Sequence, residues 1–300
     1  MILRAGTHRL ELGARPLLMG ILNATPDSFS EERGEEPLSA RVRRGRALIA
    51  AGADLLDVGG ESARGDRPAV SVQEEIERVC GLVAALADEA LISVDTYKPE
   101  VAEAAVAAGA AIVNDVSGLR DVRLAEVCAR TGAGLVVMHT AVAPKGTLLD
   151  PATYDDVVND VVAFLTERVA VARAAGVGEE QLVLDPGPDF AKTPAQTVAV
   201  LRRLDAVAAL GRPILLAASR KDFIGAVTGR PPAERDPGTL AALAYGVEQG
   251  ASILRVHDVA GVRDFFAVRA VLAGERELGP LEGLTPERYP DGVPSHLSLG

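Results

Sequence analysis

The stretch GAAIVNDVSG, residues 109–118, decides the fold because it joins a helix end, an apolar strand and a polar strand end. Three further stretches repeat this order: GADLLDVGG at 52–60, GAGLVVMHT at 132–140 and GASILRVHD at 250–258. Short runs that are almost wholly apolar are typical of strands buried on both faces of a parallel sheet. The repetition predicts a chain in which buried parallel strands alternate with helices.

The same alternation extends along nearly the whole chain. Strands are expected at 16–22, 54–58, 91–94, 111–113, 134–138, 181–185, 213–217 and 252–256. Helices are expected at 38–52, 72–89, 99–109, 122–132, 154–176, 195–207, 238–250 and 261–274, and many of them end in Gly, a common helix terminator. We predict an α/β fold, a single-domain (β/α)₈ TIM barrel over residues 1–274, followed by a Pro- and Gly-containing tail at 275–300. An open doubly wound sheet is the alternative, because it alternates in the same way.

The composition excludes several functional classes. A net charge of −11, with 3% aromatic residues and no Trp, argues against a nucleic-acid partner. No apolar run approaches membrane-spanning length, and the N-terminus MILRAGTHRLELG lacks the apolar region of a signal peptide. Cys80 and Cys128 stand alone in helical segments, with no zinc or disulfide spacing. We therefore expect a soluble, cytoplasmic protein with no membrane partner.

Nearly every expected strand ends in an ionisable or amide residue. In a TIM barrel the active site is built where the strands end, so these side chains should converge on one pocket. Carboxylates and amides would offer hydrogen bonds on one side of this pocket, and cations would gather on the other. The strand ends are Asn23, Asp57–Glu61, Asp95, Asn114–Asp115, His139, Asp185, Ser219–Lys221 and Arg255–His257–Asp258.

Three loop motifs narrow the chemistry. NATPDSFS at 23–30 is made of turn-forming residues, so alone it is equally well explained as an ordinary loop. SRKDFIG at 219–225 places a Lys after the seventh strand, and RVHDVA at 255–260 places Arg and His on the eighth. Loops after the seventh and eighth strands commonly bind phosphate in these barrels. The motifs together predict a phosphorylated ligand.

At this point the chain resembles the dihydropteroate synthases, pterin-binding TIM-barrel enzymes of the folate pathway. The segments that carry the resemblance span the barrel in order: MGILNATPDSFS (19–30), DVGGES (57–62), SVDTYKPEVAEAAVAAGAAIVNDVSG (93–118), VVMH (136–139), LVLDPG (182–187) with FAKT (190–193), SRKDFIG (219–225) and RVHDV (255–259). The resemblance implies a transferase that joins 4-aminobenzoate to a hydroxymethyl-dihydropterin diphosphate. It also implies a Mg²⁺ cofactor and a homodimer.

The resemblance assigns roles that suit the residue types. Recognition of a pterin edge needs carboxylates for its N–H donors and an amide or ammonium for its acceptors. The implied pterin residues are Asp95, Asn114, Met138, Asp185 and Lys221. Asp95 and Asp185 could instead be helix N-caps, and Met138 could be ordinary core filling.

The leaving diphosphate needs positive charge and hydrogen-bond donors. The implied diphosphate residues are Asn23, Arg64, Arg255 and His257, and Asn23 is also the implied Mg²⁺ ligand. Lys221, Arg255 and His257 are the catalytic candidates, since the implied reaction is a nucleophilic displacement at the exocyclic methylene of the pterin. An arylamine is already nucleophilic at neutral pH, so no strong general base is required.

The acceptor side departs from the family pattern. The implied aminobenzoate residues are Ser62, Ala63, Phe190, Arg220, Lys221 and Asp222. The family usually has Gly-Glu-Ser-Thr-Arg-Pro-Gly where this chain has GESARGD at 60–66, and often has Ser at the position of Asp222. A carboxylate there would repel the aminobenzoate carboxylate, unless it serves as the N-cap of the next helix. In the loop DPGPDFAKT, Pro188, Asp189 and Ala191 replace an apolar residue and two glycines.

These departures leave alternatives open. We hypothesise intact pterin and diphosphate sites beside an altered acceptor site, which could also affect sulfonamide sensitivity. One alternative is a catalytically weak paralogue that binds pterin with another acceptor or with none. Another is a pterin-dependent methyltransferase, against which the phosphate-type residues Lys221, Arg255 and His257 argue. We expect the loops at 24–36 and 61–70 to become ordered when substrates bind.

Overall fold

A computed structural model describes residues 1–13, 15–24, 36–62, 68–146 and 148–279 of the chain. Eight parallel strands close into a barrel in the order β10-β3-β4-β5-β6-β7-β8-β9, which confirms the predicted TIM barrel over the open sheet. The strands are β3 (Leu17–Asn23), β4 (Leu55–Gly59), β5 (Leu91–Asp95), β6 (Ile112–Asp115), β7 (Gly134–Met138), β8 (Leu182–Asp185), β9 (Ile214–Leu216) and β10 (Ala251–Val256).

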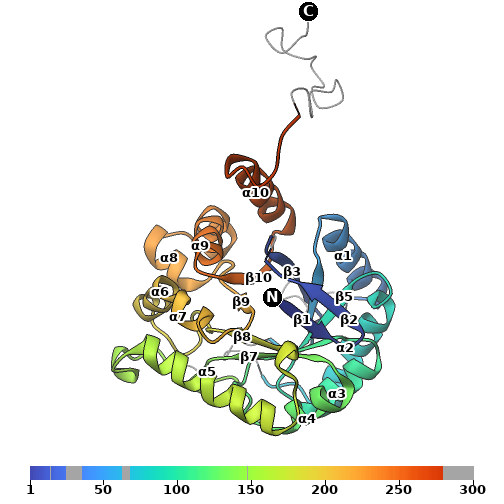
Figure 1. Cartoon of the computed structure of the whole chain (residues 1–300). Helices are drawn as coiled ribbons and strands as arrows, with labels where there is room; N and C mark the ends of the chain where they lie inside the picture. The colour runs from blue at the N-terminus through green and yellow to red at the C-terminus, as the bar shows by residue number, and fades with distance from the viewer. Residues whose placement is uncertain (14, 25–35, 63–67, 147, 280–300) are drawn as a thin grey trace, which may run out of the picture.

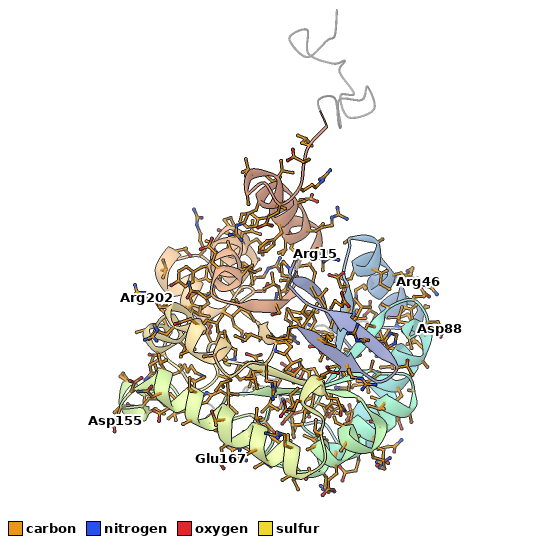
Figure 2. The ribbon with its side chains drawn as sticks, viewed as in Figure 1. Arg15, Arg46, Asp88, Asp155, Glu167 and Arg202 are labelled. Carbon is orange, nitrogen blue, oxygen red and sulfur yellow. The ribbon has the colours of Figure 1, made fainter. Side chains whose placement is uncertain are left out.

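A ring of helices surrounds the barrel (Figure 1). The helices are α1 (Leu38–Ala50), α2 (Val72–Leu86), α3 (Pro99–Ala107), α4 (Arg123–Thr131), α5 (Val157–Ala174), α6 (Pro194–Arg202), α7 (Leu204–Ala208), α8 (Asp222–Thr228), α9 (Asp236–Glu248) and α10 (Val259–Leu272). Their inner faces form a continuous apolar layer against the strands, in which side chains such as Leu82, Leu165 and Leu243 are fully buried. Each such side chain contributes about 1.5–3 kcal/mol on burial. Figure 2 shows Arg46 on α1 and Glu167 on α5 at the outer edge of the ring, facing away from this layer.

The sequence did not predict the N-terminal hairpin, β1 (Ile2–Ala5) and β2 (His8–Glu11). Leu3, Ala5 and Leu12 pack against the lower layer of the barrel interior, which includes Met19 and Leu55. The Gly6 N–H donates to the Gly132 carbonyl, just before β7 begins, at 2.8 Å. The hairpin therefore closes the barrel at the ends where the strands begin, and leaves the opposite end for the site.

One expected helix is wrong. The segment 195–207 is two helices, α6 and α7, because the backbone at Arg203 leaves the helical region with φ −121° and ψ 33°. The expected tail at 275–300 is described only as far as residue 279, and most of the expected mobile loops, 25–35 and 63–67, likewise lie outside the described residues. No helix in the described part of the chain is long and apolar enough to cross a membrane.

Candidate active site

A cavity of about 260 Å³ opens where the barrel strands end. Its lining residues come from many strands and from the loops that follow them. They are Ile21, Asn23, Glu61, Ser62, Asp95, Asn114, Val116, Met138, Asp185, Phe190, Ala217, Lys221, Arg255 and His257. The structure thus brings together all of the predicted pterin residues, and every predicted diphosphate residue except Arg64. Ala63 and Arg64 lie outside the described residues.

Strand register explains why these side chains share one level. Asp95 pairs with Gly59 on one side and Asn114 on the other, and Met138 pairs with Asp185. Neighbouring parallel strands therefore present their last residues to the same cavity. Neither Asp95 nor Asp185 is a helix N-cap, because Lys98 and Thr193 hold those positions in α3 and α6.

The centre of the polar network is Asp57, a fully buried residue to which the sequence assigned no specific role. Its Oδ1 accepts from the Ser93 hydroxyl at 2.7 Å. Its Oδ2 accepts from the Asn114 amide at 3.1 Å and from Arg255 Nε at 2.6 Å. Because its NH₂ group faces Asp57, Asn114 keeps a buried Oδ1 that accepts no hydrogen bond from the described residues. That oxygen is available to an N–H donor of a ligand.

Arg255 joins two carboxylates in this structure. Besides its bond to Asp57, Nη2 donates to Asp95 Oδ2 at 2.9 Å. A guanidinium has five N–H donors, so these two bonds leave others for an anion. Burial is the main cause that raises the pKa of Asp95, and the charge of Asp57 acts in the same direction while Arg255 opposes it. The three side chains form one electrostatic unit.

Asp185 is a second buried carboxylate in the cavity wall. Burial raises its pKa to about 6, against the opposing effects of the Gly187 N–H and the nearby Lys221. The Gly187 N–H donates to Oδ1 at 2.7 Å. No bond to Oδ2 is recorded among the described residues, so this oxygen can receive donors from a ligand.

The cationic side of the cavity comes from β9 and β10. The ammonium of Lys221 lies 4.3 Å from the centre of the Phe190 ring, a cation–π contact. Burial lowers the pKa of Lys221, although Asp189 and Asp185 oppose this effect. The amino group of Lys221 therefore lies against an aromatic face, near two carboxylates that favour its charged form.

His257 is held by Ser219. The backbone N–H of His257 donates to the Ser219 Oγ at 3.3 Å, and the same hydroxyl lies 2.9 Å from the ring Nδ1. If the hydroxyl proton goes to Nδ1, the neutral ring carries its own proton on Nε2. Burial lowers the pKa of His257 to about 4, with Arg220 and Arg255 adding to the effect. The His257 ring is thus neutral at neutral pH, and in this tautomer its Nε2 can donate to a ligand.

The structure corrects both interpretations of Asp222. It is the first residue of α8 and not the N-cap, which is Lys221. Its carboxylate is 82% exposed and pairs with Arg235 at 2.8 Å, so it does not line the cavity. Arg220 does not line this cavity either, since its Nε and Nη2 bond to Asp236 at 2.8 and 2.9 Å. It lines an adjoining cavity that shares Lys221, Arg255 and His257. The predicted repulsion of an acceptor carboxylate by Asp222 is therefore absent from this arrangement.

The backbone conformation of the loop after β8 explains why the family commonly has glycines there. Gly187, Asp189 and Ala191 have φ of 65°, 62° and 50°, the left-handed region that favours glycine. Asp189 has a compensating role. Its Oδ1 accepts from the Thr197 hydroxyl at 3.0 Å, and its Oδ2 accepts from the backbone N–H of Asp222 at 2.5 Å. The side chain that replaces a glycine thus ties the β8–α6 loop to the start of α8.

The base of the loop after β4 is fixed by a cluster of ion pairs. Lys98 Nζ lies 2.6 Å from both Glu61 and Glu75, two carboxylates that are 5% and 1% exposed. Lys145, from the loop after β7, also pairs with Glu61 and donates to the carbonyl of Ser62. Ser62 therefore lines the cavity at a position that these ion pairs and the Lys145 hydrogen bond hold in place.

Asn23 is the only residue that the sequence proposed for a metal. It ends β3 and lines the cavity. Among the described residues, no group of three or more His, Cys, Asp or Glu side chains could hold a metal ion. One amide oxygen suits a Mg²⁺ ion that takes most of its ligands from phosphate oxygens and water.

Comparisons with known proteins agree with this geometry. The family model of the pterin binding enzymes matches residues 19–257. Dihydropteroate synthase of Bacillus subtilis (strain 168) is 42% identical over 248 residues, 82% of this chain and 84% of the relative. A solved structure of Xanthomonas albilineans dihydropteroate synthase with 4-aminobenzoic acid has a TM-score of 0.83 at 42% identity, and covers 91% of this chain and 99% of that one. The Xanthomonas enzyme in complex with 7,8-dihydropteroate has a TM-score of 0.80 at 40% identity, over 90% and 98% of the two chains.

Proposed function

Because the chain belongs to the pterin binding enzyme family, as a dihydropteroate synthase of folate biosynthesis, we propose roles for its cavity residues in that reaction. The enzyme condenses 4-aminobenzoate with (7,8-dihydropterin-6-yl)methyl diphosphate, and the products are 7,8-dihydropteroate and diphosphate. Each proposed role depends on the hydrogen-bonding capacity and the charge of a side chain that lines the cavity.

The pterin is held by the carboxylate wall. Asp185 Oδ2 and the Asp95 carboxylate accept from the N–H groups of the ring, and Asn114 Oδ1 accepts from another. Lys221 donates to a ring acceptor, and Met138 packs against the ring face. The single observation that carries this proposal is the buried Asn114 Oδ1, because an unpaired buried acceptor implies a donor that arrives with the ligand.

The diphosphate is received by the donors at the end of β10. His257 donates through Nε2, and Arg255 uses the guanidinium donors not taken by Asp57 and Asp95. Arg64 would add a further cation from the loop after β4. Asn23 would hold Mg²⁺ together with phosphate oxygens, and the bound ion would neutralise charge on the departing group.

The acceptor is placed between Phe190, Lys221 and Ser62, which line the same cavity. Its carboxylate is attracted by the Lys221 ammonium, and its ring packs on Phe190. Arg220 and Asp222 contribute indirectly, through the ion pairs that fix the β9–α8 turn. The proposed acceptor site therefore keeps Ser62, Phe190 and Lys221 in the cavity, although its loop sequence differs from the family pattern.

The chemical step is a displacement at carbon. The lone pair of the arylamine nitrogen forms a bond to the pterin methylene while the carbon–oxygen bond to the diphosphate breaks. The bonding electrons leave with the diphosphate, and the nitrogen loses a proton to water. Arg255, His257 and Lys221 stabilise the developing negative charge, and the cavity holds the reacting atoms in line.

A diphosphate-release assay tests this function. Release should require both 4-aminobenzoate and Mg²⁺ and should be matched by 7,8-dihydropteroate formed in equal amount. Equal release without 4-aminobenzoate would contradict the proposed condensation at this site, and full activity in excess chelator would contradict the role of Mg²⁺.

The chain is proposed to act as a homodimer in the cytoplasm. Adjacent helices α8, α9 and α10 expose large apolar side chains: Val227, Tyr245, Val268 and Leu272, at 76%, 41%, 60% and 83%. Such a surface is a candidate subunit interface.

Both cysteines are free, which suits the proposed cytoplasmic location, a reducing compartment. The dimer can be tested directly. Sedimentation analysis of Leu272→Asp should give monomers where the native protein gives dimers; a monomeric native protein would contradict the proposal.

A further inference from the structure

Lys192 has no role in the reaction described above, yet it is the largest buried polar side chain near the cavity. It is 1% exposed and lies in the loop that connects β8 to α6. Burying an ammonium is costly unless its hydrogen bonds are made. The contacts of Lys192 therefore indicate what it does.

Three acceptors surround the Lys192 ammonium. The His139 Nδ1 lies at 2.7 Å, the Gly187 carbonyl oxygen at 2.9 Å and the Phe190 carbonyl oxygen at 3.1 Å. An ammonium has three N–H donors, so this set satisfies it fully. Burial lowers the pKa of Lys192 to about 7, while the nearby charge of Asp185 favours the ammonium form. Burial lowers the pKa of His139 to about 3, and Lys192 adds to the effect, so the ring is neutral and its Nδ1 can accept. No carboxylate of the described residues pairs with Lys192, and its partners are polar groups of the loop itself and of the neighbouring strand end.

The loop that Lys192 holds has an unfavourable backbone. Asp189 and Ala191 are non-glycine residues at positive φ, each with a cost of about 1 kcal/mol or more. The Tyr154 hydroxyl, from the segment just before α5, donates to the Ala191 carbonyl at 3.0 Å and so holds the same loop. Such a loop keeps its conformation only if outside contacts fix it.

This conformation places Phe190 in the site. The Phe190 carbonyl is bound by Lys192, while the Phe190 ring faces the Lys221 ammonium at 4.3 Å and lines the cavity. The two groups belong to one residue, so a shift of the carbonyl shifts the ring.

We propose that Lys192 is a positioning residue, whose ammonium, held by His139, binds the β8–α6 loop so that Phe190 faces Lys221 and completes the 4-aminobenzoate site. This inference rests on the proposed acceptor role of Phe190. Lys192 does not touch the reacting atoms, so its removal should weaken acceptor binding more than it slows the chemical step.

The test is steady-state kinetics of Lys192→Met, which keeps the side-chain length and removes the donors. The KM for 4-aminobenzoate should rise about tenfold, since small misplacements of a binding group have effects of this size. The kcat and the KM for the pterin diphosphate should stay within about threefold of the native values. Tyr154→Phe, which removes one bond to the same loop, should raise the acceptor KM by a smaller factor of about three.

Two further variants separate the possible outcomes. Leu3→Ala destabilises the barrel from the hairpin at its far end, so it controls for loss of stability alone. An equal rise in acceptor KM in Leu3→Ala and Lys192→Met, or a loss confined to kcat, would overturn the inference. Phe190→Ala tests the premise: an unchanged acceptor KM would overturn both the acceptor site and the inference. If Phe190→Ala raises the acceptor KM and Lys192→Met does not, the role of Lys192 alone is refuted.

Discussion

The two walls of the cavity are built in different ways. The pterin wall consists of the strand-end side chains Asp95, Asn114 and Asp185, whose positions are set by barrel register. The buried Asp57 supports this wall through its bond to Asn114. The acceptor wall consists of loop residues such as Phe190, which is placed by local contacts to side chains from other elements. A strand end cannot move without breaking the sheet, whereas a loop depends on a few hydrogen bonds.

This difference explains where the chain departs from its family. The residues with assigned pterin roles match the family pattern. The changes fall in loops and at the first residue of α8, and they include Ala63, Gly65, Asp66, Pro188, Asp189, Ala191 and Asp222. At two of these positions the structure supplies a compensation: Asp189 bonds to the start of α8, and Asp222 pairs with Arg235. The sequence can thus change at Asp189 and Asp222 without loss of the cavity, because each of these two side chains has a partner outside it.

The largest effect is expected from the pterin wall. Asp185→Ala removes a buried acceptor that no neighbour can replace, so kcat/KM for the pterin diphosphate should fall about 100- to 1,000-fold. The KM for 4-aminobenzoate should change little. Asp54→Asn, at the start of β4 and paired with Arg15, is the control for carboxylate loss away from the cavity. A fall of less than about threefold in Asp185→Ala would show that the wall does not hold the pterin.

Asp57→Asn should have the next largest effect. It weakens the bond to Arg255 Nε and disturbs the orientation of Asn114. The free energy of unfolding should fall by about 2–3 kcal/mol, because a buried charge loses a partner, and pterin affinity should fall about 30-fold. Chemical denaturation and calorimetric titration measure the two quantities. Ser93→Ala, which removes only one bond to Asp57, should show a smaller change in both; equal changes would argue against Asp57 as the centre of the network.

The pH dependence should also distinguish the two walls. Asp185 has a folded pKa of about 6, above its ordinary value near 4, so the folded state binds more protons in this range than the unfolded state. This group therefore makes the ligand-free protein less stable as pH rises from about 4 to 6. Pterin binding needs the ionised carboxylate, so pterin affinity should rise about tenfold between pH 5 and 7. Asp185→Asn should remove the Asp185 share of both slopes and leave the share of Asp95, whose pKa burial raises to about 7. Slopes unchanged from those of the native protein would assign the titration to another group.

The smallest effect is expected at Asp222, the residue that the sequence predicted to repel the aminobenzoate carboxylate. Asp222→Ser restores the residue common in the family, yet the Asp222 carboxylate is 82% exposed and bound to Arg235. The KM for 4-aminobenzoate and the kcat should both stay within about twofold. Arg235→Ala releases the same carboxylate without changing Asp222 itself. A large gain of activity in Asp222→Ser would restore the hypothesis of an altered acceptor site.

Much of the fold followed from local patterns. The apolar runs gave the eight barrel strands to within a few residues, since strands buried on both faces leave a strong signal. The N-terminal hairpin was missed because β2, HRLE, is short and mostly polar, and its strand character depends on pairing with β1. The break at Arg203 was missed because the sequence at 195–207 has no Gly or Pro to indicate it.

The sequence predicted which residues lie at the site better than it predicted which of them bond to one another. Strand ends identify which residues meet at the rim, because barrel closure brings them all together. They do not identify partners: Arg255 binds Asp57 and Asp95, which are 198 and 160 positions away. Lys192 and His139 were present in the quoted FAKT and VVMH motifs, but their contact spans two loops and left no local signal. The exposure of Asp222 likewise depends on Arg235 from the following loop.

The most direct test is a pair of calorimetric titrations on the native protein, Asp185→Asn and Phe190→Ala. One ligand is the pterin diphosphate and the other is 4-aminobenzoate, added with Mg²⁺ and diphosphate present. Asp185→Asn should lose pterin affinity by about 100-fold and Phe190→Ala should keep it, whereas only Phe190→Ala should weaken 4-aminobenzoate binding directly. If each substitution weakens both ligands by the same factor, the two walls are not independent and the account is wrong.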